Sequence, residues 1–116
     1  MDKLKTKHII PYLPYKLKVI SYGKIYNVDG VDINENIIDF DFDYLSFKAI
    51  KPILRSFDSL SAVEIKEIFP HYYKHGKDYL KEEVTTRQID VITFNRLLKR
   101  HIDVFNLITF GLAEEK

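Results

Sequence analysis

The chain of 116 residues contains no cysteine and no tryptophan, and it has only four glycines and four prolines. Without cysteine it can form neither disulfide bonds nor a thiolate zinc site, which fits a reducing compartment. The four glycines are isolated from one another, so there is no glycine-rich phosphate-binding loop. No apolar run approaches the length of a membrane span, and the charged, polar N-terminal residues are unlike a secretory signal. We therefore expect a soluble, cytoplasmic protein without a membrane segment.

The residue patterns of common catalytic sites are also missing. No serine stands in a glycine-flanked nucleophile elbow, and the four histidines lack the spacing of a metalloprotease helix. His101 lies on the apolar side of a predicted helix, where we expect a partly buried ring with one hydrogen-bonded nitrogen. The acidic residues are predicted to be solvated, unlike the paired carboxylates of acid catalysis. We expect a non-enzymatic protein with no metal and no cofactor.

The chain does contain many aromatic rings and an uneven distribution of charge. Eight tyrosines and eight phenylalanines supply rings for a core and for partly exposed edges. The net charge is only +1, but residues 1–24 carry six lysines against one aspartate. Residues 25–47 carry six acidic residues and no lysine or arginine. Separated faces of opposite charge can attract a charged partner or pair with each other.

The first half of the chain has the composition of short β-strands. Residues 16–22 are rich in β-branched and aromatic residues, and a turn at Gly23 leads into a second predicted strand over residues 25–28. Asp29-Gly30 is a dipeptide typical of positions that need a positive φ, either in a hairpin turn or at a bulge. We expect this half to form an antiparallel meander of three to five short strands.

Three aspartates alternate with apolar residues between positions 38 and 43. This period of two predicts one half-buried antiparallel strand whose carboxylates project from one face about 6.5–7 Å apart. That spacing is too wide for all three carboxylates to bind one ion, and a calcium loop would also need a glycine at its sixth position. The pattern favours a solvated acidic face or a face that binds a basic partner. The candidate partner-binding residues are Asp39, Asp41 and Asp43.

Two segments, residues 11–19 and 50–55, place proline among apolar and basic residues. Because proline is disfavoured in helix interiors and central strands, we expect both to lie at an edge of the sheet or to lead into it, with their tyrosines and lysines at its rim. Pro52 is expected on an edge strand or at a bulge, within a further strand over residues 47–54. Such an edge offers a route to self-association, which is one alternative for the role of the protein.

The second half changes to the period of helices. Ser61 and Glu64 have the spacing of a capping box, which predicts a short helix over residues 62–69 that ends before Pro70. The pattern of residues 71–79 predicts neither a helix nor a strand. With strands first and helices after, the sequence predicts an α+β fold with two or three helices packed on the sheet, in a single domain of residues 1–116.

A final helix is predicted after Thr93, which has the position of its N-cap. Apolar residues recur at three- and four-residue steps from Phe94 to Ile108, and this spacing marks one buried stripe. Gly111 is placed where a helix C-terminus needs a residue that adopts a positive φ. We therefore expect one helix from Phe94 to just before Gly111.

Basic and aromatic residues occur together at two places in this half. Three cations of the final helix predict a basic patch, and two adjacent tyrosines beside Lys74, His75 and Lys77 combine stacking rings with positive charge, as in single-strand binders. No known nucleic-acid-binding motif is present and the net charge is low, so ordinary solvated helix charge remains the alternative. The candidate nucleic-acid-binding residues are Arg96, Lys99, Arg100, Tyr72, Tyr73 and Lys74.

Three segments carry a resemblance to a known family: HIIPYLPYKLKV at residues 8–19, IKPILRSFDSL at residues 50–60 and HIDVFNLITFGLA at residues 101–113. Together they span roughly a third of the chain. They resemble a family of small phage and prophage proteins of Bacteroidetes hosts, for which no catalytic residues carry over. The resemblance implies a phage origin and the host bacterial cytoplasm. The chain also looks like an anti-CRISPR inhibitor of the type VI-B RNA-guided RNA nuclease, although residues 69–90 depart from the family pattern.

Two main hypotheses about function follow from the residues and the resemblance. In the first, a non-enzymatic phage protein inhibits a host defence ribonucleoprotein, and its partner is the CRISPR effector or the effector's guide-RNA complex. The predicted acidic strand would then face a basic, RNA-binding channel of the effector. In the second, the chain is an accessory protein of phage replication that binds RNA or single-stranded nucleic acid directly. A third hypothesis is that the chain is a structural phage component that forms oligomers.

Overall fold

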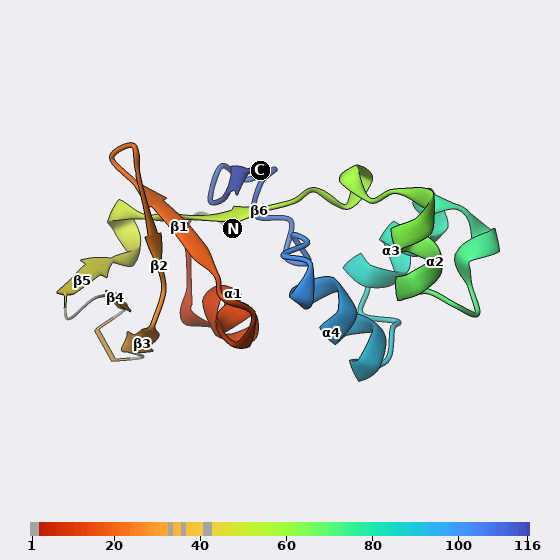
Figure 1. The fold of residues 1–116 in the computed structure, drawn as a ribbon, viewed down its shortest axis with the longest axis horizontal. Helices are drawn as coiled ribbons and strands as arrows, with labels where there is room; N and C mark the ends of the chain where they lie inside the picture. The colour runs from red at the N-terminus through yellow and green to blue at the C-terminus, as the bar shows by residue number, and fades with distance from the viewer. Residues whose placement is uncertain (1–2, 33, 36, 41–42) are drawn as a thin grey trace.

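A computed structural model describes residues 3–32, 34–35, 37–40 and 43–116. The molecule is elongated, with extents of 45 × 25 × 24 Å. Strands gather at one end together with the first helix, the later helices lie at the other end, and the segment that carries β6 (Lys51–Leu54) runs between them (Figure 1). We call residues 18–54 together with β7 the strand region, and residues 57–99 the helical region. The predicted α+β fold, with strands mostly before helices, is confirmed.

The N-terminal segment is helical. α1 (Thr6–Ile9) continues directly into the 3₁₀ helix η1 (Ile10–Tyr15), which holds one proline in its first turn and a second, Pro14, inside. The Ile10 N–H still donates to the Thr6 carbonyl, and the next residue, Pro11, has no N–H, so the regular α-helical hydrogen bonds stop at this point. The expectation that tyrosines of this segment lie at a sheet rim is wrong for Tyr12, which is fully buried.

The larger sheet has the strand order β2-β1-β6-β7. β1 (Lys18–Ser21) and β2 (Lys24–Asn27) form an antiparallel hairpin, so the predicted strands and the turn at Gly23 are confirmed. Tyr22 and Gly23 both have positive φ, 48° and 80°, as a two-residue type I′ turn requires. β6 (Lys51–Leu54) runs antiparallel to β1, and β7 (Glu114–Glu115) runs parallel to β6.

Pro52 does not lie on an edge strand, because β6 is flanked by β1 on one side and β7 on the other. Pro52 pairs with Val19 of β1, whereas β7 begins to pair one residue later, at Ile53. The short C-terminal strand therefore avoids the residue that lacks an N–H group. The edge expected from the sequence is covered by a segment about sixty residues further along the chain.

The second sheet contains β3 (Gly30–Asp32), β4 (Ile37–Phe40) and β5 (Asp43–Ser46) in that order. The prediction of one continuous strand over residues 38–43 is wrong, because β4 and β5 pair antiparallel with Phe40 opposite Asp43. The alternating pattern thus spans two strands that run in opposite directions. The positive φ expected at Gly30 is also absent: Gly30 opens β3 and pairs with Asp39.

Three short helical elements and the helices α2, α3 and α4 complete the fold. α2 (Ala62–Ile68) begins with the predicted capping box: Ser61 Oγ accepts from the Glu64 N–H, and Glu64 Oε1 accepts from the Ser61 N–H, both at 3.1 Å. α3 (Lys77–Thr85) was not predicted. The three 3₁₀ turns are η2 (Phe47–Ala49), η3 (Phe57–Ser59) and η4 (Tyr73–His75).

The final helix, α4 (Val91–Lys99), differs from its prediction at both ends. Its N-cap is Asp90, whose carboxylate accepts a hydrogen bond from the Thr93 N–H at 2.7 Å, so Thr93 is not the cap. The helix ends early because His101 adopts a φ of 57°. The N–H groups of His101 and Ile102 then bond to the carbonyls of Leu98 and Leu97, which is the Schellman pattern.

Beyond α4 the chain forms single turns. The Asp103 carboxylate accepts from the N–H groups of Leu107 and Ile108, each at 2.8 Å, and this starts a new turn. Gly111 has the predicted positive φ of 72°, but it ends this turn and not a continuous helix. The apolar stripe expected over residues 94–108 is therefore divided between α4 and a loop that packs on the core.

One hydrophobic core joins both regions, and Tyr12 lies where they meet. Its hydroxyl donates to the Ile102 carbonyl at 2.5 Å and accepts from the Val104 N–H at 3.2 Å. η1 also packs against α4. Burial raises the pKa of Tyr12, so the hydroxyl stays protonated and keeps donating. We call this contact of Tyr12 with residues 102–104 the junction.

Candidate nucleic-acid interface

Three aromatic rings of the helical region form a partly exposed series, which we call the aromatic stack: Tyr72, His75 and Tyr79. The ring centroids of Tyr72 and His75 lie 6.1 Å apart at an interplanar angle of 31°, and those of His75 and Tyr79 lie 4.7 Å apart at 32°. Tyr72 is 58% exposed and Tyr79 is 45% exposed. The rings are therefore tilted toward a common orientation, and all three residues are exposed.

Local turn geometry places these rings together. The Tyr72 N–H donates to the Phe69 carbonyl and the His75 N–H donates to the Tyr72 carbonyl, at 3.1 and 3.0 Å, so the chain coils tightly after α2. Gly76 then adopts a φ of 87°, which a residue with a side chain rarely reaches, and α3 starts immediately after it. Buried Leu80 anchors the inner face of α3, which leaves the preceding residue, Tyr79, outside.

Tyr73 has a different role from its neighbour Tyr72. Its ring is half-buried against the core, and two ammonium groups lie over it: Lys66 Nζ at 5.4 Å and Lys74 Nζ at 5.9 Å from the centroid. Such cation–π contacts hold the two lysines over the Tyr73 ring. Tyr73 therefore positions positive charge, whereas its neighbour Tyr72 is exposed.

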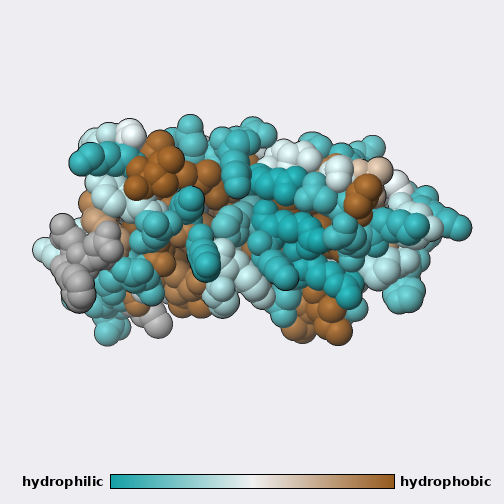
Figure 2. Space-filling model, viewed as in Figure 1, coloured by the Kyte–Doolittle hydropathy of each residue, from teal (hydrophilic) through white to brown (hydrophobic). Residues whose placement is uncertain are grey.

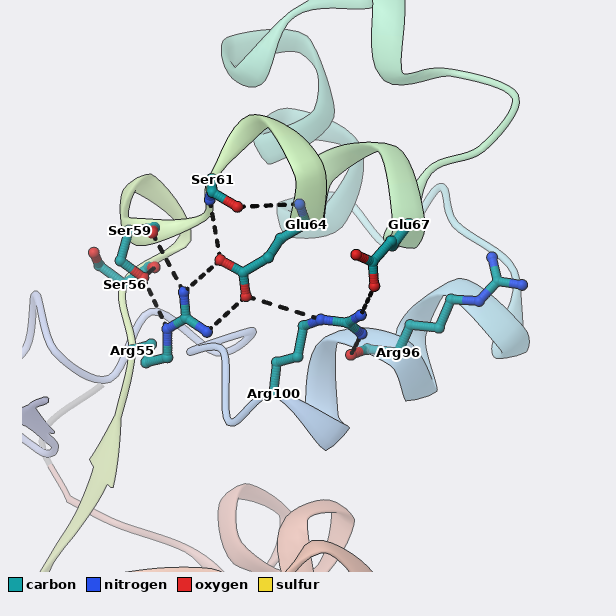
Figure 3. Close-up of polar contacts among 8 residues, drawn as sticks. All are labelled: Arg55, Ser56, Ser59, Ser61, Glu64, Glu67, Arg96 and Arg100. Atoms are coloured by element: carbon teal, nitrogen blue, oxygen red, sulfur yellow. Dashed lines mark hydrogen bonds and ion pairs between the residues drawn. The ribbon is translucent and has the colours of Figure 1, made fainter.

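The three predicted cations of the last helix do not form a free basic patch. Arg100 Nη2 lies 2.9 Å from Glu67 Oε2, and its Nε lies 3.9 Å from Glu64 Oε2 (Figure 3). Arg96 Nη1 donates to the Ile68 carbonyl at 3.2 Å. Both arginines thus hold α4 against α2. Lys99 is exposed, whereas Arg96 and Arg100 are half-buried.

Arg55 and Glu64 form the centre of this ion-pair network. The two guanidinium nitrogens donate to the two carboxylate oxygens at 2.8 and 2.9 Å, in a bidentate arrangement (Figure 3). The hydrogen bonds from Arg55, and then those from Ser61, lower the pKa of Glu64 to about 2. Because Arg55 follows β6 and Glu64 belongs to α2, the pair ties the strand region to the helical region.

A small cavity of about 230 Å³ lies beside the aromatic stack. Tyr72 and Tyr79 form part of its wall, together with the start of α4 at Asp90 and Thr93. The Thr93 N–H, which donates to the Asp90 carboxylate, lowers the pKa of that group. The volume is below the roughly 300–1,000 Å³ of typical small-molecule sites, so it suits a single ring or side chain.

The predicted acidic surface does not form in the way that the sequence suggests. Asp39 of β4 is exposed and lies opposite Tyr44 of β5 in the strand register, whereas Asp43 of β5 lies opposite Phe40 of β4. Asp41 lies outside the described residues. The aspartates therefore do not alternate along one strand. Within the described ranges, no group of three or more histidine, aspartate or glutamate side chains could hold a metal ion.

Two further expectations concern single residues. His101 is half-buried and its Nε2–H donates to the Tyr15 carbonyl, which confirms the prediction of one hydrogen-bonded nitrogen. Tyr79 is the member of the aromatic stack that sequence reasoning missed. Tyr79 lies in α3, which was not predicted, whereas His75 lies before Gly76 in η4, so no helical spacing in the sequence joined the two rings.

Comparison of the chain with protein-family models, with curated proteins and with solved structures finds no match. Among the residues that the structure describes, no helix is long and apolar enough to cross a membrane.

Proposed function

We propose that this protein binds single-stranded nucleic acid, and RNA in particular, without catalysing a reaction. The observation that supports this proposal is the aromatic stack, whose three rings lie in series on the surface. Two lysines lie over the ring of Tyr73, the residue that follows Tyr72. Bases stack on such rings regardless of sequence, and each stacked base contributes about 1–3 kcal/mol to binding. Lys66 and Lys74 are exposed and can pair with the phosphates of the same strand.

The proposal assigns different roles to the residues that the sequence suggested. Tyr72 stacks directly, Lys74 contacts phosphate, and Tyr73 holds Lys74 in place. Arg96 and Arg100 keep α2 and α4 together and contribute to binding through the fold. The affinity for nucleic acid is then modest and depends on salt, because only a few cations contact the phosphates of the bound nucleic acid.

The test is a titration of a fluorescently labelled uridine oligonucleotide at low salt, read by anisotropy. Tyr72→Ala and Tyr79→Ala should each weaken binding by about tenfold, in line with the loss of one stacked base. Tyr22→Asn removes an exposed tyrosine from the strand region and should leave binding unchanged. A flat titration with the unaltered protein, or an equal loss in Tyr22→Asn, would contradict the proposal.

A second candidate is the phage inhibitor of an RNA-guided RNA nuclease, which the resemblance of residues 8–19, 50–60 and 101–113 implies. One observation favours it: Val91 and Ile92, at the start of α4, are 73% and 63% exposed. Figure 2 shows apolar surface at the edge of the molecule where Figure 1 draws this end of α4. Adjacent exposed aliphatic side chains are typical of a protein-binding surface, not of a phosphate-binding one.

The inhibitor hypothesis is tested by RNA cleavage assays with the purified type VI-B effector and its guide RNA. Val91→Ser combined with Ile92→Ser should abolish inhibition while direct oligonucleotide binding is retained. Asp39→Lys combined with Asp43→Lys tests the acidic residues that the sequence indicated, with thermal unfolding as the check on folding. If the unaltered protein leaves RNA cleavage unaffected, this second candidate is wrong. The nucleic-acid proposal is then decided by the oligonucleotide titration alone.

A further inference from the structure

A second and larger cavity, of about 470 Å³, shares no wall residue with the aromatic stack. It opens where α1, η3, α3 and the loop of residues 103–109 meet. Three cations and a buried histidine contribute to its wall, beside acidic and aromatic side chains. The wall includes Lys7, His8, Asp58, Lys81, Arg87 and Phe105.

His8 has an unpaired polar atom in this wall. The residue is fully buried, its Nδ1 accepts a hydrogen bond from the Lys5 N–H at 3.0 Å, and its Nε2 has no partner among the described residues. Because Nδ1 accepts, the neutral ring carries its proton on Nε2. Burial, followed by the nearby charges of Lys7 and Lys5, lowers the pKa of His8, so the ring is neutral near pH 7. A buried N–H donor without an acceptor is costly, and a ligand that supplies an acceptor removes that cost.

The charges around the cavity favour an anion. Of its two carboxylates, Asp58 lies 3.2 Å from Lys81 Nζ, and Asp103 already accepts two backbone hydrogen bonds. Lys7 is exposed at the cavity wall. Arg87 lies with its guanidinium carbon 5.0 Å from the centre of the Phe105 ring, and its Nη1 donates to two backbone carbonyls. Its remaining N–H groups are available to a ligand.

Apolar side chains form another part of the wall. Phe57 and Phe105 both contribute, and the edge-to-face contact of His8 with Phe105, 5.3 Å between ring centres, places the histidine next to this apolar surface. A ligand that fills the cavity therefore needs an anionic end and an apolar or aromatic end. The volume lies within the range of ordinary small-molecule sites.

We propose that this cavity binds a small organic phosphate, whose phosphoryl oxygens accept from His8 Nε2 and pair with Lys7, Lys81 and Arg87, and whose apolar part packs on Phe57 and Phe105. The site is independent of the aromatic stack. A phosphate is favoured over a single carboxylate because the wall contains three cations and a histidine with one unpaired N–H, which matches the several acceptor oxygens of a phosphate group.

The test uses phenyl phosphate as the probe, with inorganic phosphate and phenol as its two halves. Binding is followed by NMR of the histidine ring nitrogens and by calorimetry. Phenyl phosphate should bind more tightly than inorganic phosphate, and it should shift the Nε2 resonance of His8. Phenol should produce neither effect. If millimolar phenyl phosphate leaves the His8 resonance unchanged, or if phenol binds equally well, the proposal is wrong.

Two substitutions test the contribution of the histidine to binding separately from that of the charged side chains. His8→Asn keeps an acceptor at the position of Nδ1 for the Lys5 N–H but removes the donor at Nε2, and it should weaken phenyl phosphate binding by about tenfold. Lys81→Ala changes an exposed side chain, so it tests the site without altering the core, and a several-fold loss is expected. Lys24→Ala, on exposed β2, is the matched control. Equal affinity of Lys81→Ala and Lys24→Ala would overturn the assignment even if His8→Asn failed to fold.

Discussion

Tyr12 and Tyr72 occupy similar places in the sequence, each one or two residues after a proline, yet the fold treats them differently. Tyr12 is fully buried at the junction, whereas Tyr72 is largely exposed in the aromatic stack. The difference comes from the distance to their partners along the chain. The partners of the Tyr12 hydroxyl lie 90 and 92 residues away, while Tyr72 packs on a ring three residues away. The same residue type therefore serves the core at the junction and an exposed surface in the aromatic stack.

The comparison separates a tyrosine that stabilises the fold from those that we propose to bind nucleic acid. A buried tyrosine needs a partner for its hydroxyl, and Tyr12 has both a carbonyl acceptor and an N–H donor. The tyrosines of the aromatic stack have no such requirement, because they are exposed and water can bond to their hydroxyls. Removal of a hydroxyl should therefore affect stability at the junction, and removal of a ring should affect binding at the stack.

The largest effect is expected for Tyr12→Phe. This change leaves the buried Val104 N–H and Ile102 carbonyl without their partner, and it should lower the free energy of unfolding by about 1–3 kcal/mol. Tyr72→Phe should change it by less than about 0.5 kcal/mol, since exposed substitutions away from caps and cores are close to neutral. Chemical denaturation measures both values. Similar losses in the two variants would erase the distinction between the regions.

A second effect concerns the ion pairs that join the two regions. Glu64→Gln should lower the free energy of unfolding at pH 7 by about 1–2 kcal/mol, because it weakens the bidentate pair with Arg55. The pKa of Glu64 is about 2 in the folded chain, below the ordinary value of 4.5. Its contribution is therefore complete above pH 4.5 and is lost as the pH falls toward 2.

Denaturation at several pH values measures this contribution. The difference between the unaltered protein and Glu64→Gln should shrink as the pH falls from about 4.5 to about 2. Glu67→Gln is the matched control, because Glu67 is exposed and contacts only Arg100 in Figure 3, and a loss below about 1 kcal/mol is expected. A difference that stays constant with pH would mean that Glu64 does not carry the shifted pKa.

The smallest effect is expected at a third tyrosine, Tyr22, which is 93% exposed at the tip of the β1–β2 hairpin. Its φ of 48° is unfavourable for an aromatic residue and favourable for asparagine. Tyr22→Asn creates the Asn-Gly pair preferred in type I′ turns and should raise the free energy of unfolding by about 0.5 kcal/mol. Thermal denaturation would show a higher midpoint. A lower one would mean that the Tyr22 ring has a packing role like that of Tyr12.

Local signals in the sequence predict the elements whose stabilising contacts are also local. The capping box of α2 and the turn of the β1–β2 hairpin are both confirmed, since each depends on residues within a few positions. α3 was missed because only Leu80 and Val84 are buried on it, and two apolar residues do not define a helical stripe. The early end of α4 was missed because His101 occupies a left-handed position that usually belongs to glycine.

Prediction of the candidate site is limited in the same way, because contacts between distant residues leave no local signal in the sequence. The alternation of aspartates with apolar residues continues through both β4 and β5, so the sequence pattern does not reveal that two strands share it. Arg96 and Arg100 look like a basic patch until α2 supplies their acceptors. Tyr72 and Lys74 are exposed, as a surface site requires, and their role in binding stays a prediction.

The most direct measurement of the central claim is a side-chain NMR titration with a single-stranded uridine oligonucleotide. Stacked bases shift the resonances of the rings that they cover, so the account predicts changes at Tyr72, His75 and Tyr79. The resonances of Tyr12 and Tyr22 should stay in place, because one ring is buried at the junction and the other lies at the far hairpin. Shifts confined to the strand region, or no shifts in the aromatic stack at saturating oligonucleotide, would contradict the account.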